Sequence, residues 1–204
     1  MKTISEIISY LLIILLIFSL ISLILFWGLP YLQKRQDEMK VSLIFNDLFS
    51  GESSNSIVNK MKNSLFRKTV EKIGGYDGSW NITVANFAIN EPSSIIFYFV
   101  SKVSPVNSGE WITIYGCGKE ICEIHEGFYD VKISSERIGD SFIVKYGVFL
   151  KKLRMKDKIY NITFNVTNFN PNIRSYYFPA KFIYLSSEIR DINEKEGIII
   201  FWVR

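Results

Sequence analysis

A long stretch near the start of the chain is apolar on every side, because residues 7–29 contain no charged side chain. As a helix this stretch spans about 34 Å, enough to cross a hydrocarbon core of about 30 Å with some tilt. The core helix of a soluble protein rarely stays apolar on all faces for so long. The pattern predicts a transmembrane helix at residues 4–30.

A cleaved secretory signal is the main alternative for this stretch. Such signals have an apolar core of about 7–15 residues followed by small residues at the cleavage site. Here the apolar run is longer, and it leads into Trp27 and Tyr31, whose rings suit a membrane interface, with Lys34 and Arg35 just beyond. We therefore expect the helix to remain in the mature protein.

The pattern becomes amphipathic over residues 31–75. Residues 33–49 alternate apolar and charged positions in a way that predicts an extension of the same helix, with a kink at Pro30. Residues 51–55 read as a loop. Residues 56–73 place apolar side chains on one face and lysines on the other, which predicts a second helix that ends at Gly74 and Gly75.

From Trp80 onward the helical period gives way to alternation of apolar and polar residues. Short strands at this spacing without long helices between them indicate an antiparallel β-sandwich of immunoglobulin-like architecture, which we place at residues 76–204. The last strand is too apolar for an exposed edge, so we expect it in the core or paired with a neighbouring subunit. The predicted strands are residues 81–89, 95–103, 111–117, 122–125, 128–133, 142–153, 158–167, 177–185 and 198–203.

Composition fits one membrane helix and one β-rich domain. Of the 204 residues 48% are apolar, and the net charge of +4 comes from lysines spread among acids, which does not indicate nucleic-acid binding. The single histidine, His125, lies between acids and reads as a solvated strand residue. No phosphate-binding loop, calcium loop or zinc-protease motif is present, and no carboxylate pair stands out. We therefore expect no catalytic residues, no metal, no cofactor and no enzymatic activity.

The two cysteines, Cys117 and Cys122, flank a Gly-Lys-Glu-Ile segment between two alternating stretches. We interpret these stretches as a hairpin that places the cysteines opposite each other, at a separation that a disulfide can span. Two free core thiols are the alternative. A zinc site with His125 lacks a clear fourth ligand. A disulfide would favour an oxidising exterior for the domain.

The sequence contains opposing signals for the orientation of the helix in the membrane. Lys34, Arg35 and Lys40 lean mildly toward a cytoplasmic C-terminal domain by the positive-inside rule. The cysteine pair and three glycosylation acceptor patterns favour an extracellular one. In the predicted strand 158–167, two of the acceptors share a face that points away from the core. The three candidate acceptors are Asn81, Asn161 and Asn165.

The chain start, Ile-Ser-Glu-Ile-Ile at residues 4–8 before an apolar helix, resembles archaeal type IV pilin-like proteins, which carry a β-sandwich head. The resemblance implies that a prepilin peptidase removes residues 1–3 and leaves Ile4 first, with Glu6 close to the new amine. Packed helices could pair this carboxylate with a neighbour's amino terminus. Thr3 stands where the family prefers Gly or Ala. Without the resemblance, Glu6 suits the headgroup region at a helix N-terminus.

The sequence thus predicts a non-enzymatic type IV pilin-like subunit at the cell surface. Its helix would anchor it in the membrane or pack in a filament, and its extracellular sandwich would serve adhesion or assembly. Expected partners are the membrane, further copies or other pilin-like subunits, and the surface layer. The alternatives are a membrane-anchored sandwich of the archaellum stator type, which binds the surface layer, and an anchored extracellular enzyme or receptor.

Overall fold

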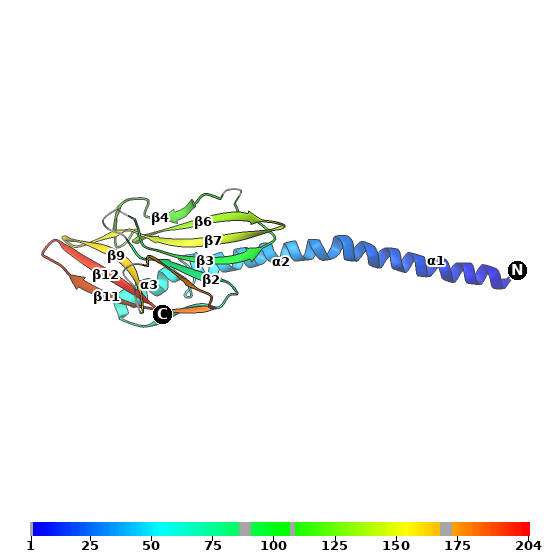
Figure 1. Ribbon diagram of the computed structural model, residues 1–204, viewed down its shortest axis with the longest axis horizontal. Coiled ribbons are helices and arrows are strands. Elements are labelled where there is room, and N and C mark those ends of the chain that lie inside the picture. The colour runs from blue at the N-terminus through cyan, green and yellow to red at the C-terminus, as the bar shows by residue number, and fades with distance from the viewer. Residues whose placement is uncertain (1, 86–90, 107–108, 168–172) are drawn as a thin grey trace. The chain divides into compact units, whose positions relative to one another are not determined.

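The computed structural model describes residues 2–85, 91–106, 109–167 and 173–204, without the side chains of residues 2, 3 and 5. The chain divides into two compact units, Met1–Lys40 and Val41–Arg204. The first unit is helical, and the second contains the strands (Figure 1).

Helical residues follow one another from Lys2 to Phe49, as α1 (Lys2–Leu23), the π-helical turn η1 (Ile24–Gly28), α2 (Leu29–Ile44) and a second π-helical turn, η2 (Phe45–Phe49). The helix at Glu6–Phe49 is long and apolar enough to cross a membrane by its length and composition. None of its most apolar window is buried within the chain. The helix predicted at residues 4–30 is therefore present, and so is its extension.

The helix is irregular just before Pro30. The backbone N–H of Leu29 donates to the carbonyl oxygen of Ile24, which is the i to i−5 pattern of a π-helix. Pro30 has no N–H to offer the carbonyl of Phe26, so a regular α-helical bond cannot form there. The disturbance expected at Pro30 thus takes the form of a wider helical turn on its N-terminal side.

Two six-stranded sheets form the head and confirm the predicted sandwich. Most neighbouring strands are antiparallel, but β12 pairs with β9, and β5 with β8, in parallel. Sheet A has the order β1 (Glu71–Gly74), β11 (Phe182–Asp191), β12 (Glu196–Val203), β9 (Lys158–Val166), β8 (Lys152–Met155), β5 (Ile121–Glu123). Sheet B has the order β10 (Ser175–Phe178), β2 (Ser79–Thr83), β3 (Ser94–Ser101), β7 (Ser141–Leu150), β6 (Tyr129–Ile138), β4 (Ile112–Gly116).

The core lies between the two sheets and follows the alternation of the sequence. On β9, Ile162, Phe164 and Val166 are buried, whereas Asn161 and Asn165 point to the other side and are half-buried. The final strand β12 lies between β11 and β9, so the expected core position of residues 198–203 is confirmed.

The C-terminal end of the long helix belongs to the core of the head. Ile44, Leu48 and Phe49 are fully buried, and the ring of Phe49 lies 5.2 Å from that of Tyr146 on β7. The third helix, α3 (Ile57–Arg67), buries one apolar face and packs against β11 and β1. The compact head therefore begins at Val41, earlier than the residue 76 at which the sequence placed the start of the sandwich.

Three of the predicted elements end early or are divided in the structure. The helix predicted at residues 56–73 is α3, and it ends at Arg67. Lys68 adopts a left-handed conformation, and the following residues form β1, which pairs with β11. The predicted strand 142–153 is two strands in different sheets, β7 and β8. The predicted strand 177–185 is also two, β10 and β11, since Pro179 between them cannot continue a paired strand. Part of the strand predicted at residues 81–89, from residue 86 on, lies outside the described residues.

Candidate functional site

The apolar helix presents its side chains to the surroundings along most of its length. Ile4 is 64% exposed, Phe18 65% and Trp27 79%. Glu6 is also exposed and lies in the second turn of α1 rather than in the first, because the helix already begins at Lys2. The side chain of Thr3, the residue before the expected cut, is outside the described part of the chain. A surface of this kind requires lipid or other apolar helices around it.

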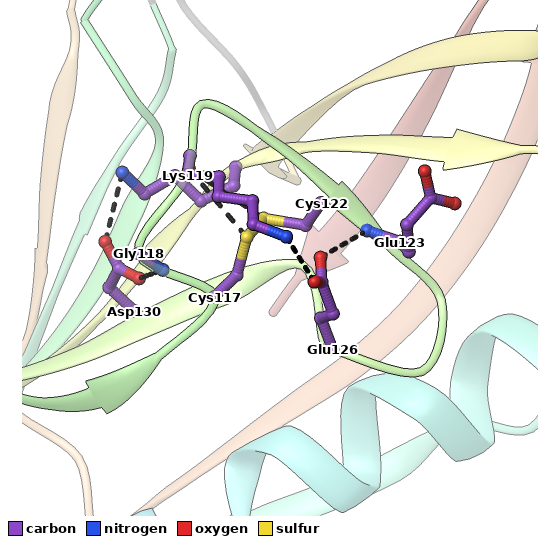
Figure 2. The surroundings of a disulfide bond; sticks show 8 residues. Cys117, Gly118, Lys119, Cys122, Glu123, Glu126 and Asp130 are labelled. Carbon is purple, nitrogen blue, oxygen red and sulfur yellow. Dashed lines mark hydrogen bonds and ion pairs between the residues drawn. A yellow bond between two sulfur atoms is a disulfide. The ribbon is translucent and has the colours of Figure 1, made fainter.

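The predicted disulfide between Cys117 and Cys122 is present, with the two Cα atoms 6.0 Å apart. The predicted hairpin is wrong. Cys117 follows β4 in sheet B, and Cys122 lies on β5, which pairs with β8 in sheet A. The bridge therefore spans the point at which the chain crosses from one sheet to the other, and it excludes the free-thiol alternative (Figure 2).

Asp130 on β6 holds the first half of this crossover. Its carboxylate accepts a hydrogen bond from the Gly118 N–H at 3.1 Å (Figure 2). It also forms an ion pair with Lys151, whose Nζ lies 3.0 Å from Asp130 Oδ2. The position just before the bridge has no room for a side chain, which explains the glycine there. A Cβ at Gly116 would lie 2.4 Å from the Asp130 carboxylate and 2.6 Å from the Tyr129 carbonyl oxygen. Gly116 beside Cys117 is the sequence signal for this close approach.

Glu126 holds the second half of the crossover. It pairs with Lys119 and accepts the backbone N–H of Glu123 at 3.2 Å (Figure 2). The bond from Lys119 and then that from Glu123 lower the pKa of the Glu126 carboxyl. His125 is exposed in the intervening turn, not on a strand. Because the sulfurs are bonded to each other, they do not offer thiolate ligands for the zinc alternative with His125. The described residues contain no group of three potential ligands with metal-site geometry.

Sequence reasoning missed a polar cluster at the end of the long helix. Asp47 in η2 accepts hydrogen bonds from Ser53 Oγ at 2.9 Å, Asn55 Nδ2 at 2.6 Å and the Tyr76 hydroxyl at 3.0 Å. Partial burial raises the pKa of Asp47, but the three donors together lower it below its usual value. Burial and then the Asp47 carboxylate raise the pKa of Tyr76 to about 12. The cluster fixes the helix end to the following loop and to the segment before β2.

The three candidate glycosylation acceptors lie on outward faces of their sheets and are half-buried. Asn81 Oδ1 accepts a hydrogen bond from Ser175 Oγ at 2.6 Å, and Asn165 Oδ1 accepts one from the Val166 N–H at 2.9 Å. Asn161 and Asn165 do not pack between the sheets, so the predicted face is confirmed. Thr163, between them, is buried and donates to the Phe164 carbonyl oxygen.

A pocket of about 150 Å³ lies near the link between β7 and β8, with Glu91, Glu120, Lys152 and Asn161 among its lining. Lys152 Nζ pairs with Glu120 at 2.8 Å, and this hydrogen bond lowers the pKa of the Glu120 carboxyl. A general acid needs a raised carboxyl pKa, which is the opposite of what this pair provides. The Lys152–Glu120 pair is therefore not arranged as a general acid.

Comparison of the chain with family models, curated proteins and solved structures finds no match. The site is therefore described by its own geometry: an apolar helix with exposed side chains, one carboxylate near its start, and a disulfide-linked sandwich that takes up the end of that helix.

Proposed function

We propose that this chain is a non-enzymatic, type IV pilin-like subunit of an archaeal cell surface, with the sandwich outside and the helix in the membrane or in a filament. The observation that carries the proposal is the exposed apolar surface of α1 behind Glu6. In water such a surface would aggregate, so it needs lipid or neighbouring helices. Both environments are those of a pilin-like helix before and after assembly.

The continuity of the helix with the head core adds support. Val41, Ile44 and Phe49 belong to the hydrophobic core of the sandwich, although they continue the helical residues that follow the apolar stretch. A flexible linker would serve a simple anchor equally well. The helical residues from Val41 on are thus part of the head rather than of a linker.

The proposal also includes the side of the membrane on which the head lies and the role of Glu6. The disulfide favours an oxidising exterior for the head. Removal of residues 1–3 would place the amine of Ile4 near Glu6, and in a helix bundle this carboxylate would pair with the amino terminus of a neighbouring subunit. Pairing offsets the cost of burying both charges.

A stator-like anchor that binds the surface layer is the second candidate, and the continuous helix fits it too. It differs in that its helix would never leave the membrane. An anchored enzyme or receptor has weaker support, since the pocket beside the link between β7 and β8 holds the ion pair of Lys152 with Glu120.

The deciding experiment combines mass spectrometry of the native N-terminus with the ratio of this protein in sheared surface fibres to that in membranes. We expect a mature chain that begins at Ile4 and a large fibre fraction. Glu6→Gln should keep the protein in the membrane but lower the ratio about tenfold or more, because an uncompensated amine would be left in the bundle. Glu52→Gln, an exposed change in the loop after the helix, is the matched control and should leave the ratio unchanged.

Equal ratios for Glu6→Gln and the control would reject the pairing role. A charge that merely sits at the membrane interface contributes only about 0.3–1 kcal/mol near a helix N-terminus, and its loss would change assembly little. Absence of fibres in all strains, with an uncut N-terminus, would favour the permanently anchored alternative.

A further inference from the structure

The four edge strands of the sandwich differ in how they are protected against pairing with another chain. Natural sheets block their edges with charged residues, prolines or very short strands. In sheet A, β1 carries Glu71 and Lys72, and β5 has only three residues, one of them Glu123. Both edges of sheet A therefore carry the usual protection.

Both edges of sheet B lack charge, although the register of β4 against β6 is interrupted by a bulge or irregularity between Thr113 and Tyr115. The strand β4 reads Ile-Thr-Ile-Tyr-Gly, and β10 reads Ser-Tyr-Tyr-Phe. Ile112 is 44% exposed and Ile114 41% on β4, and Tyr177 is 64% exposed on β10. Within the described ranges, β4 pairs only with β6 and β10 only with β2, so each is an edge strand with one unpaired side.

The directions of these two strands match each other. Sheet B is antiparallel throughout and has six strands, so its two edge strands run in opposite directions. When a second copy is placed beside the first in the same orientation, its β10 meets β4 of the first copy as an antiparallel neighbour. The alternation of the sheet then continues across the contact without a break.

We propose that sheet B is an edge-to-edge interface, in which β4 of one copy pairs with β10 of the next copy of this chain. The contact is heterologous, so it leaves one open edge at each end and builds rows rather than closed pairs. It adds a contact between heads to the proposed function, and it depends on that proposal only for the shared orientation that a common membrane gives to all copies.

The contact buries little surface, so we expect it to be weak. Four or five residues per strand bury a few hundred Å², below the roughly 1,000 Å² of a stable independent complex. Pro179 follows β10 and prevents a longer pairing. Anchoring in one membrane supplies the missing affinity, because it converts free collision into an encounter at high effective concentration. Rows should thus form on membranes at protein densities where the chain in detergent is monomeric.

The test uses the full chain in phosphatidylcholine vesicles, labelled on a C-terminal extension, with cluster size counted from single-molecule photobleaching steps. Ile114→Lys places a charge on the β4 edge, and Tyr177→Lys places one on the β10 edge. Val100→Lys is the matched control, because Val100 is 61% exposed but lies on the inner strand β3 of the same sheet. Wild type and the control should show clusters beyond two, and each edge variant should be monomeric.

Mixing the two edge variants separates a heterologous contact from a two-fold one. Ile114→Lys keeps an intact β10 edge, and Tyr177→Lys keeps an intact β4 edge, so the mixture should form clusters of two and no more. If β4 paired with β4, Tyr177→Lys alone would cluster like wild type and mixing would rescue nothing.

Three outcomes overturn the proposal: monomeric wild type at all densities, clusters of either edge variant as large as those of wild type, or equal loss in Val100→Lys. Co-flotation of every variant with the vesicles is measured in the same samples. Loss of flotation would count against the membrane part of the proposed function, whereas flotation without clusters counts against the edge-to-edge interface alone.

Discussion

The disulfide between Cys117 and Cys122 offers the sharpest test of how the two sheets are held together. Because it joins the end of β4 to β5, it closes a short loop with a sequence separation of 5. In the chain-entropy model, a loop of this length stabilises the folded state by about 2 kcal/mol at 25 °C. Reduction should therefore lower the free energy of unfolding by about 2 kcal/mol, or the melting temperature of the head by roughly 4–8 °C.

The effect should be uneven across the head. The strand β5 is three residues long and pairs only with β8 among the described strands, so the bridge supplies much of what keeps it in place. Amide hydrogen exchange at residues 121–123 should rise on reduction, while exchange on the central strands β6 and β7 should change only through the global stability.

The assay is urea unfolding of the full chain in detergent, followed by tryptophan fluorescence, with oxidised and reduced samples of one preparation. Comparing a single sequence avoids the cavity that a substitution of the fully buried Cys122 would create. Cys117→Ala, at the half-exposed partner, should match the reduced wild type. Equal unfolding curves for the oxidised and reduced chain would refute the reasoning, as would recovery of both native cysteines as free thiols after alkylation without reduction.

Two further substitutions test the core of the head. Asp47→Ala removes the acceptor of three hydrogen bonds and should cost about 2 kcal/mol at pH 7, whereas the exposed Glu52→Gln should cost nothing measurable. Since the folded-state pKa of Asp47 is lowered, its contribution is present above the unfolded pKa of about 3.9 and is lost as pH falls through the folded value. The urea midpoints of wild type and Asp47→Ala should therefore converge below about pH 4, and a constant gap down to pH 2 would contradict this. Gly78→Ala places a Cβ 2.5 Å from the Tyr98 carbonyl oxygen and should cost about 1–3 kcal/mol, against no loss for Gly51→Ala, where nothing lies within 4 Å; equal melting temperatures for the two would contradict the close approach.

Local patterns predicted the elements and faces well. The alternation in residues 158–167 identified which side of β9 faces the core, because side-chain direction in a strand depends only on position. The apolar stretch identified the long helix for a similar reason, since its length and lack of charge are properties of the segment itself.

Features that depend on pairing partners could not be read from the sequence. Cys117 and Cys122 have the spacing of a hairpin, but spacing does not say to which sheet each flanking strand belongs. The end of α3 at Arg67 was missed because pairing of β1 with β11 outweighs the helical pattern that continues to residue 73. The cluster around Asp47 includes Tyr76, 29 residues further along the chain, and no short motif links them.

The C-terminal end of the long helix is held in the head both by apolar packing and by hydrogen bonds. Because Ile44, Leu48 and Phe49 fill part of the sandwich core, the helix end cannot leave the head without opening a cavity of several large side chains. The hydrogen bonds to Asp47 close the same region from the outside and fix the direction in which the chain continues. Residues 41–49 therefore belong to the folded head and should unfold together with the sandwich.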